Sequence, residues 1–255
     1  MCLVIIGHQQ NPQWPLLVAA NRDEFHARAT APAAYWGDNA EMLAGRDLEA
    51  GGTWMGVTRG GRFAAVTNYR DPARTAPAPR SRGELPTDFL LGTDAPMDYL
   101  ARVATRRAEY AGFNLLVGDG DSLCYLGNDG HADPLALEPG LYGLSNARLD
   151  TPWPKVELGK AVMARLLSAG EFNHESLASA VSDQTLARPE ELHDQGLGGD
   201  MDVLLSAQFI HAGSYGTRST TTILQGQDSL HWRETSFDDA GRVTGTVEEL
   251  VALAI

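Results

Sequence analysis

Cys2 lies directly behind the first methionine of the chain, in the stretch MCLVIIGHQQ. If that methionine is removed, one residue carries both a thiol and a free α-amino group. An α-amine has a pKa of about 7.7–8 in model peptides, so it can take a proton from the thiol near neutral pH. Cys2 is therefore a candidate nucleophile that supplies its own base. The alternative is that Cys2 is a small apolar residue at the start of a buried strand.

A polar cluster, Asn21–Glu24, closes the apolar run LLVAA. The runs 2–7 and 16–21 flank a polar, proline-containing turn and are expected to form a hairpin. In an antiparallel hairpin the end of the second strand lies beside the start of the first. We therefore expect the cluster to lie next to Cys2. The alternative is a solvated strand end with local ion pairs, each worth about 0–1 kcal/mol.

Three further residues lie at the ends of expected strands. Asn68 ends FAAVTN and Asn146 ends LYGLSN, while Arg218 begins the β-branched part of YGTRSTTTIL. Amide donors that converge on one point can stabilise the oxyanion of a tetrahedral intermediate. A fixed guanidinium can bind a carboxylate or steady a nucleophile. The alternatives are turn-forming asparagines and an arginine on an edge strand.

The histidines show no spacing typical of metal ligands. We therefore predict no metal site and no required cofactor. His211, in QFIHAG, is a candidate ligand or base, and its alternative is a hydrogen-bonded structural histidine.

Strand-like segments come in pairs, and helical segments lie between the pairs. Several strand-like runs are apolar at consecutive positions, which indicates strands that are covered on both faces. This pattern predicts an α+β fold in which antiparallel sheets and helices form layers. The expected hairpins are 2–7 with 16–21, 53–58 with 63–68, 113–118 with 122–127, and 219–224 with 229–237. The expected helices are 84–91, 94–110, 155–167 and 175–183. A capping box at Ser81 is expected to begin the first of them, and Gly170 to end the third. Residues 186–202 are expected to form a surface excursion, and residues 246–255 a helix or a strand.

Composition and charge set the class of protein. A length of 255 residues suits one domain, and we expect 1–255 to be a single unit. The net charge of −13 argues against nucleic acid as a partner, because phosphate backbones would be repelled. Two cysteines make no disulfide framework.

No apolar run approaches the ~20 residues of a membrane span, so we predict no integral membrane segment. The apolar run Leu3–Ile6 lacks the flanking residues of a signal peptide. We therefore predict a cytoplasmic protein.

The sequence resembles the NRDE-motif family, whose eukaryotic members are called transport and Golgi organisation protein two. The resemblance covers most of the chain apart from residues 171–205. It rests on these stretches: the opening MC, Asn21–Glu24, GGTWMGV (51–57), RFAAVTNYRDP (62–72), SRGEL (81–85), FNLLVGD (113–119), YGLSNARLDTPWPKV (142–156) and YGTRSTTTIL (215–224).

That family is similar in turn to N-terminal-nucleophile hydrolases, among which choloylglycine hydrolases and penicillin V acylases also open with Met-Cys. The resemblance implies a four-layer αββα sandwich of antiparallel sheets. Those enzymes place the arginine and aspartate of their second strand three residues apart, whereas the corresponding residues are adjacent here. The resemblance implies these catalytic residues: Cys2, Arg22, Asp23, Asn68, Asn146 and Arg218.

Three functions follow as hypotheses. The first is a cysteine amidohydrolase that acts on a non-peptide C–N bond of a small molecule. The second, which the resemblance also implies, is a non-catalytic binder or chaperone of haem or of an acylated lipid such as acyl-coenzyme A. The third is a trafficking protein that acts through its surface. Nothing in the sequence specifies an oligomeric state. The expected ligand-binding residues are Asn21, Glu24, Trp54, Tyr69 and His211.

Overall fold

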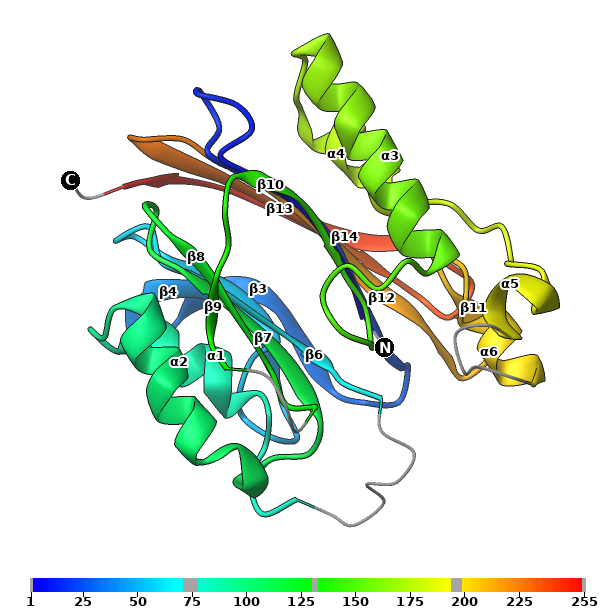
Figure 1. Cartoon of the computed structure of the whole chain (residues 1–255), viewed down its shortest axis with the longest axis horizontal. Coiled ribbons are helices and arrows are strands. Elements are labelled where there is room, and N and C mark those ends of the chain that lie inside the picture. The colour runs from blue at the N-terminus through cyan, green and yellow to red at the C-terminus, as the bar shows by residue number, and fades with distance from the viewer. Residues whose placement is uncertain (1, 71–77, 130–132, 194–198, 254–255) are drawn as a thin grey trace.

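The computed structural model describes residues 2–70, 78–129, 133–193 and 199–253. Two antiparallel sheets stack face to face, and helices cover the outer face of each sheet (Figure 1). The layers therefore follow the order αββα, as predicted.

The first sheet contains both ends of the described chain. Its strands run in the order β10-β1-β2-β12-β13-β14, and β11 pairs with β12. The strands are β1 (Cys2–His8), β2 (Leu16–Phe25), β10 (Gly140–Leu144), β11 (His211–Ala212), β12 (Tyr215–Gln225), β13 (Ser229–Phe237) and β14 (Val243–Ala252).

The second sheet follows the chain order from β3 to β9 without a crossover. Each strand therefore pairs with the next along the sequence. The strands are β3 (Thr30–Trp36), β4 (Asn39–Asp47), β5 (Met55–Thr58), β6 (Phe63–Asn68), β7 (Phe113–Gly118), β8 (Leu123–Gly127) and β9 (Leu135–Ala136).

The helices pack in two groups. Over the second sheet lie α1 (Glu84–Leu91), α2 (Pro96–Thr105) and the 3-10 helix η1 (Arg107–Glu109). Over the first sheet lie α3 (Pro154–Ala169), α4 (His174–Ala178) and the 3-10 helix η2 (Ser179–Val181). The expected surface excursion at 186–202 contains α5 (Pro189–His193) and the start of α6 (Asp200–Leu204), and residues 194–198 of it lie outside the described residues.

Three apolar cores explain why the strand sequences are hydrophobic at consecutive positions. Val4 and Ile6 of β1 face the core between the sheets, while Leu3 and Ile5 face the core under α3. Because neighbouring side chains of a strand point to opposite faces, a strand that is covered on both faces must be apolar throughout. The prediction of doubly covered strands is confirmed.

The ends of the helices test two finer predictions. Gly170 follows α3 with φ of 70°, a left-handed backbone that glycine adopts without strain, as predicted. The capping box at Ser81 was wrong. The residue before α1 is Gly83, and no side chain caps the helix. The Ser81 hydroxyl instead accepts a hydrogen bond from the Gly83 N–H at 3.2 Å.

The four expected hairpins all form. In the turn between β5 and β6, Gly61 has a positive φ of 77°. Of the segment 246–255, for which both helix and strand were expected, residues 246–252 belong to strand β14, and residues 254 and 255 lie outside the described residues. Among the described helices, none combines the length and the apolar composition that crossing a membrane requires.

Candidate active site

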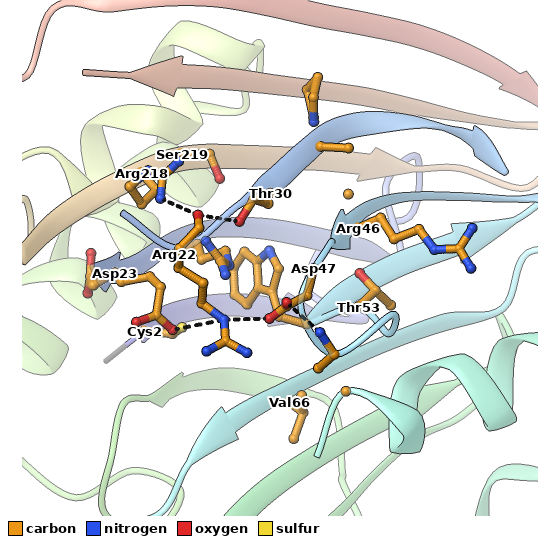
Figure 2. Close-up of a pocket in the computed structure, with 18 of the residues that line it drawn as sticks. Cys2, Arg22, Asp23, Thr30, Arg46, Asp47, Thr53, Val66, Arg218 and Ser219 are labelled. Carbon is orange, nitrogen blue, oxygen red and sulfur yellow. Dashed lines mark hydrogen bonds and ion pairs between the residues drawn. The ribbon is translucent and has the colours of Figure 1, made fainter. Parts of the chain in front are cut away.

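A cavity of about 660 Å³ opens where β1 and β2 meet the ends of the facing sheet. Cys2, Arg22 and Asp23 lie together at one side, and Arg218 and Ser219 come from the neighbouring strand β12 (Figure 2). Its other walls come from β3 and β4, from the segment before α1, and from β13 and β14. The cavity therefore draws on strand ends of both sheets.

The hairpin of β1 and β2 places the polar cluster beside Cys2. In the observed register Cys2 is opposite Arg22, and Leu3 is opposite Asn21. Residues directly opposite each other in an antiparallel pair project to the same face. Cys2 shares this face with Val4, so it points to the side of the facing sheet. The predicted proximity of Cys2 and the cluster is confirmed.

Arg22 and Asp23 point to opposite faces of β2. Arg22 continues the inner face of Ala20, whereas Asp23 continues the outer face of Ala19, toward the helices. The guanidinium and the carboxyl group therefore leave the same strand on different sides.

Hydrogen bonds fix Asp23 in the protein interior. The side chain is 3% exposed, and its Oδ1 accepts a hydrogen bond from the Thr217 hydroxyl at 2.7 Å. The Tyr215 hydroxyl donates to the Asp23 carbonyl oxygen at 2.9 Å. Burial raises the pKa of Asp23 to about 6. This carboxyl group therefore gains or loses its proton near pH 6, which is slightly below neutral pH.

A β-bulge in β12 accounts for the position of Arg218. Thr217 pairs with Asp23 and Ser219 pairs with Arg22, so Arg218 is the extra residue between them. Bulges re-aim side chains beside functional sites. The Arg218 Nη1 donates to the carbonyl oxygens of Phe25 at 2.9 Å and Arg28 at 3.1 Å. The guanidinium is thereby fixed at the cavity wall.

Lys155 is a charged neighbour that the sequence reasoning missed. It lies in the first turn of α3, is 3% exposed, and donates from Nζ to the Leu205 carbonyl oxygen at 2.9 Å. Burial lowers the pKa of Lys155, and the charges of Asp23 and Cys2 act in the opposite direction. The cation of Lys155 in turn favours the ionised form of Asp23. A helix of the outer layer therefore acts electrostatically on the site.

Burial also raises the pKa of the Cys2 thiol. The side chain is partly buried at the cavity wall. The thiolate is the reactive form, so a raised pKa lowers its share at neutral pH. A nucleophilic role for Cys2 consequently requires a base that takes the thiol proton.

The two asparagines differ in their access to the cavity. Asn68 is exposed at the end of β6 and lines the cavity. Asn146 is 1% exposed and lies outside the lining, and its Nδ2 donates to the Asn68 carbonyl oxygen at 2.8 Å. The Ser145 hydroxyl donates to the Cys2 carbonyl oxygen at 3.0 Å. Asn146 therefore joins two strand ends near Cys2 and does not face the cavity.

The expected ligand-binding residues divide in the same way. Glu24 and Trp54 line the cavity, whereas Tyr69 and His211 do not. Asn21 is fully buried outside the lining. Its Nδ2 donates to the carbonyl oxygens of Val181 and Gln208, and its Oδ1 accepts from the Thr220 hydroxyl. The structure thus assigns Asn21 to the packing of the helical layer on β2.

Arg82 and Glu234 line the cavity and were also missed. Arg82 belongs to SRGEL, a segment whose structure was interpreted as the start of a helix. Glu234 lies on β13, is 4% exposed, and accepts a hydrogen bond at Oε1 from the Ala33 N–H at 2.7 Å. Its position on an alternating strand gave no signal of a buried carboxyl group. Burial raises the pKa of Glu234.

Close contact of two glycines holds the Arg82 segment against the cavity. A Cβ added to Gly52 would lie 2.5 Å from the backbone carbon and oxygen of Gly83. The Thr53 N–H also donates to the Gly83 carbonyl oxygen at 3.2 Å. Only glycine at position 52 permits this approach of two backbones.

Gly52→Ala is expected to destabilise the protein by about 2 kcal/mol, because the added methyl group forces two backbone segments apart. Urea unfolding followed by circular dichroism measures this change. Gly37→Ala is the matched control, since a Cβ at Gly37 meets nothing within 4 Å. Equal stabilities of the two variants would contradict the role of this contact.

The described residues contain no group of three or more histidine, cysteine, aspartate or glutamate side chains that could hold a metal ion. Among the described residues that line the cavity, Cys2 is the only side chain of a type that commonly ligates haem iron. Any bound haem would therefore rely on Cys2 or on contacts to its periphery.

Comparisons with known proteins identify relatives along nearly the whole chain. The sequence profile described as "Transport and Golgi organisation 2" matches residues 1–239. The human Transport and Golgi organization protein 2 homolog is 38% identical over 89% of this chain and 90% of its own length. The mouse homolog is 37% identical over 88% of both chains. The Drosophila melanogaster protein is 29% identical over 70% of both.

Two solved structures with low sequence identity were also found. One is a Caenorhabditis elegans N-acylethanolamine-hydrolyzing acid amidase ortholog, with 8% identity, a TM-score of 0.48, and coverage of 88% of this chain and 92% of that chain. The other is the mutant C2A of conjugated bile acid hydrolase from Clostridium perfringens. It has 10% identity, a TM-score of 0.46, and coverage of 100% and 99%.

Proposed function

The chain belongs to the Transport and Golgi organisation 2 family, and on this premise we propose that it is a cysteine amidohydrolase of the N-terminal-nucleophile type. Its substrate is a small molecule with a non-peptide C–N amide bond. One observation carries the proposal. Cys2 lies at the wall of a cavity, opposite Arg22 across the hairpin, and Asp23 lines the same cavity. The cytoplasm is the compartment in which we expect this activity.

The reaction begins after the first methionine is removed. The freed α-amine of Cys2 takes the thiol proton, and the sulfur attacks the amide carbonyl carbon. The C–S bond forms, and the resulting tetrahedral intermediate loses the amine, which receives the proton from the α-ammonium group. Water then attacks the thioester, releases the carboxylic acid and restores the thiol. The net change is hydrolysis of an amide to an acid and an amine.

The surrounding residues have separate roles in this scheme. Asn68 lines the cavity and offers its amide N–H to the oxyanion. Asn146 positions Asn68 through the hydrogen bond to its carbonyl oxygen. Asp23 orients the α-amine, and Arg218 steadies the negative charge that develops near Cys2. Asn146 is thus a positioning residue, because its side chain does not reach the cavity.

Turnover of N-acyl amides tests this function. The purified full chain is incubated with a panel of N-acyl amines and N-acyl amino acids, and the free acid and amine are measured by liquid chromatography and mass spectrometry. We expect multiple turnovers of at least one member. Cys124→Ala is the matched control, because Cys124 is buried in β8 away from the cavity. Absence of turnover across the panel, together with absence of an acyl-enzyme, would overturn the proposal.

A second candidate function is the binding of haem or of an acylated lipid such as acyl-coenzyme A without cleavage. The raised pKa of the Cys2 thiol favours it, since a protonated thiol is a poor nucleophile. Saturable binding of acyl-coenzyme A, or a Soret shift of added haem that Cys2→Ala abolishes, would support this alternative. Absence of saturable binding at micromolar ligand would rule it out.

A further inference from the structure

Arginines surround the proposed nucleophile in a protein whose net charge is −13. Six of them line the cavity, and they fall into two groups. Arg28, Arg46 and Arg80 each form an ion pair with a carboxylate. Their charges are therefore balanced within the protein.

The second group, Arg22, Arg82 and Arg218, forms no ion pair within the described part of the chain. Arg82 donates from Nη1 to the Gly112 carbonyl oxygen at 3.1 Å, and Arg218 donates to two carbonyl oxygens. Carbonyl oxygens satisfy N–H donors but carry no full negative charge. These three guanidinium groups bring positive charge to the part of the cavity near Cys2. Three carboxyl groups also line the wall of this cavity, those of Asp23, Glu24 and Glu234.

Arg22 differs from Arg82 and Arg218, because one of its buried N–H donors lacks a hydrogen-bond partner in the part of the chain that the structure describes. The side chain is 7% exposed, and its Nη1 has no hydrogen-bond partner among the described residues. A buried donor without a partner destabilises the protein, and a charged donor does so more strongly. Arg22 projects to the inner face of β2 and lines the cavity. A ligand in this cavity can therefore supply the missing acceptor.

The acceptor is best a group with a single negative charge. Glu234 lies in the wall of the same cavity and interacts electrostatically with Arg22. Its Oε1 is already bonded to the Ala33 N–H. This carboxyl group opposes the entry of a dianion, whereas a carboxylate can accept the Arg22 donor in a charge-assisted hydrogen bond.

We infer that the cavity binds amides that carry a carboxylate group, with the carboxylate held by Arg22 and the amide presented to Cys2. Arg82 and Arg218 add to the positive field that attracts this group. The inference rests on the proposed function for the position of the amide. The preference for a carboxylate is a property of binding, so it is tested without cleavage.

Three matched probes test the preference by isothermal titration calorimetry on the full chain carrying Cys2→Ala, which cannot turn them over. N-decanoylglycine carries the carboxylate, N-decanoylglycinamide is its neutral counterpart, and N-decanoylaminomethylphosphonate is its dianionic counterpart. We expect N-decanoylglycine to bind at least about tenfold more tightly than the amide, the gain of one charge-assisted hydrogen bond. Equal affinities overturn the inference, and tighter binding of the phosphonate overturns the assignment to a single charge.

Arg22→Gln is expected to reduce the preference for the carboxylate to less than about threefold. Arg165→Gln, on the exposed face of α3, is the matched control and should keep it. Persistence of the preference in a folded Arg22→Gln protein contradicts the role of Arg22. If Arg22→Gln fails to fold, the comparison of probes on the parent chain still decides whether the cavity selects a carboxylate. Selective binding without hydrolysis by the unsubstituted chain would sink the proposed function and leave this inference standing.

Discussion

Replacing Cys2 by alanine is expected to lower kcat/KM for amide hydrolysis by at least about 10³-fold. Loss of a catalytic nucleophile removes the covalent route and leaves only binding and oxyanion stabilisation, which contribute far less. Alanine is also small, so it permits removal of the first methionine and keeps a free α-amine. The variant therefore tests the sulfur atom alone.

Two controls accompany the Cys2 variant. Cys124→Ala removes the other cysteine of the chain and should keep its activity within about twofold, since Cys124 packs in the core under α2. Thermal unfolding of Cys2→Ala should match that of the parent protein, because a partly buried thiol contributes little to the core. Retention of more than about a tenth of the activity in Cys2→Ala would contradict the mechanism.

Replacing Asp23 by asparagine is expected to stabilise the protein at pH 8 by as much as about 3 kcal/mol and to impair catalysis. The pKa of Asp23 is raised from 3.8 to about 6 in the folded protein. The folded state therefore holds this proton more tightly than the unfolded state, and stability is lost as pH rises from about 4 to 6. The difference of about two pKa units corresponds to about 3 kcal/mol above pH 6. Asparagine carries no charge at any of these pH values, so it avoids the loss.

Urea unfolding of both proteins between pH 4 and pH 8 measures this effect as a difference between variants. The advantage of Asp23→Asn should be largest above pH 6 and should shrink as pH falls toward 4. Asp228→Asn is the control, since Asp228 is exposed between β12 and β13 and its replacement should change stability by less than about 0.5 kcal/mol. A lower stability of Asp23→Asn than of the parent at pH 8 would contradict the cost of burying this carboxylate. A stabilising change that impairs activity is typical of an active-site residue.

The sequence was sufficient to predict the layers and the central hairpin. Continuous apolar runs in 2–7 and 16–21 indicated strands that are covered on both faces, and the expected hairpin placed the cluster Asn21–Glu24 next to Cys2. The exact register, with Arg22 opposite Cys2, came from the structure. Local signals were enough here, because the hairpin joins segments close in sequence and its apolar pattern is strong. The family resemblance added the order of the layers.

Strands β3 and β4 could not be predicted in the same way. Their sequence TAPAAYWGDNAEMLAGRD is rich in alanine and contains Pro32, and both residue types are depleted in strands. Pairing decides their structure. Leu43 of β4 pairs with Val57 of β5, and the Trp36 indole N–H donates to the Ala44 carbonyl oxygen at 3.1 Å. Tertiary contacts thus override a weak local preference.

The predicted site was incomplete where distant segments meet. Lys155 comes from a helix that follows β2 by more than a hundred residues, and Glu234 comes from a strand near the C-terminus. No local pattern reveals that a lysine in a first helical turn will be buried beside an aspartate. Asn146 was predicted to face the substrate, but its amide bonds to the carbonyl oxygen of Asn68. The direction of a strand-end side chain depends on such contacts, which the spacing of residues does not encode.

The central claim is that Cys2 becomes an N-terminal nucleophile. Intact-mass spectrometry of the purified chain, before and after exposure to an N-acyl β-lactone, tests it most directly, and peptide mapping then locates any adduct. We predict a mass lower than that of the full chain by one methionine, followed by the gain of one acyl group on Cys2. The Cys2→Ala protein should lose the same methionine and gain no acyl group. Quantitative retention of the methionine, or acylation at Cys124 in place of Cys2, would contradict the account.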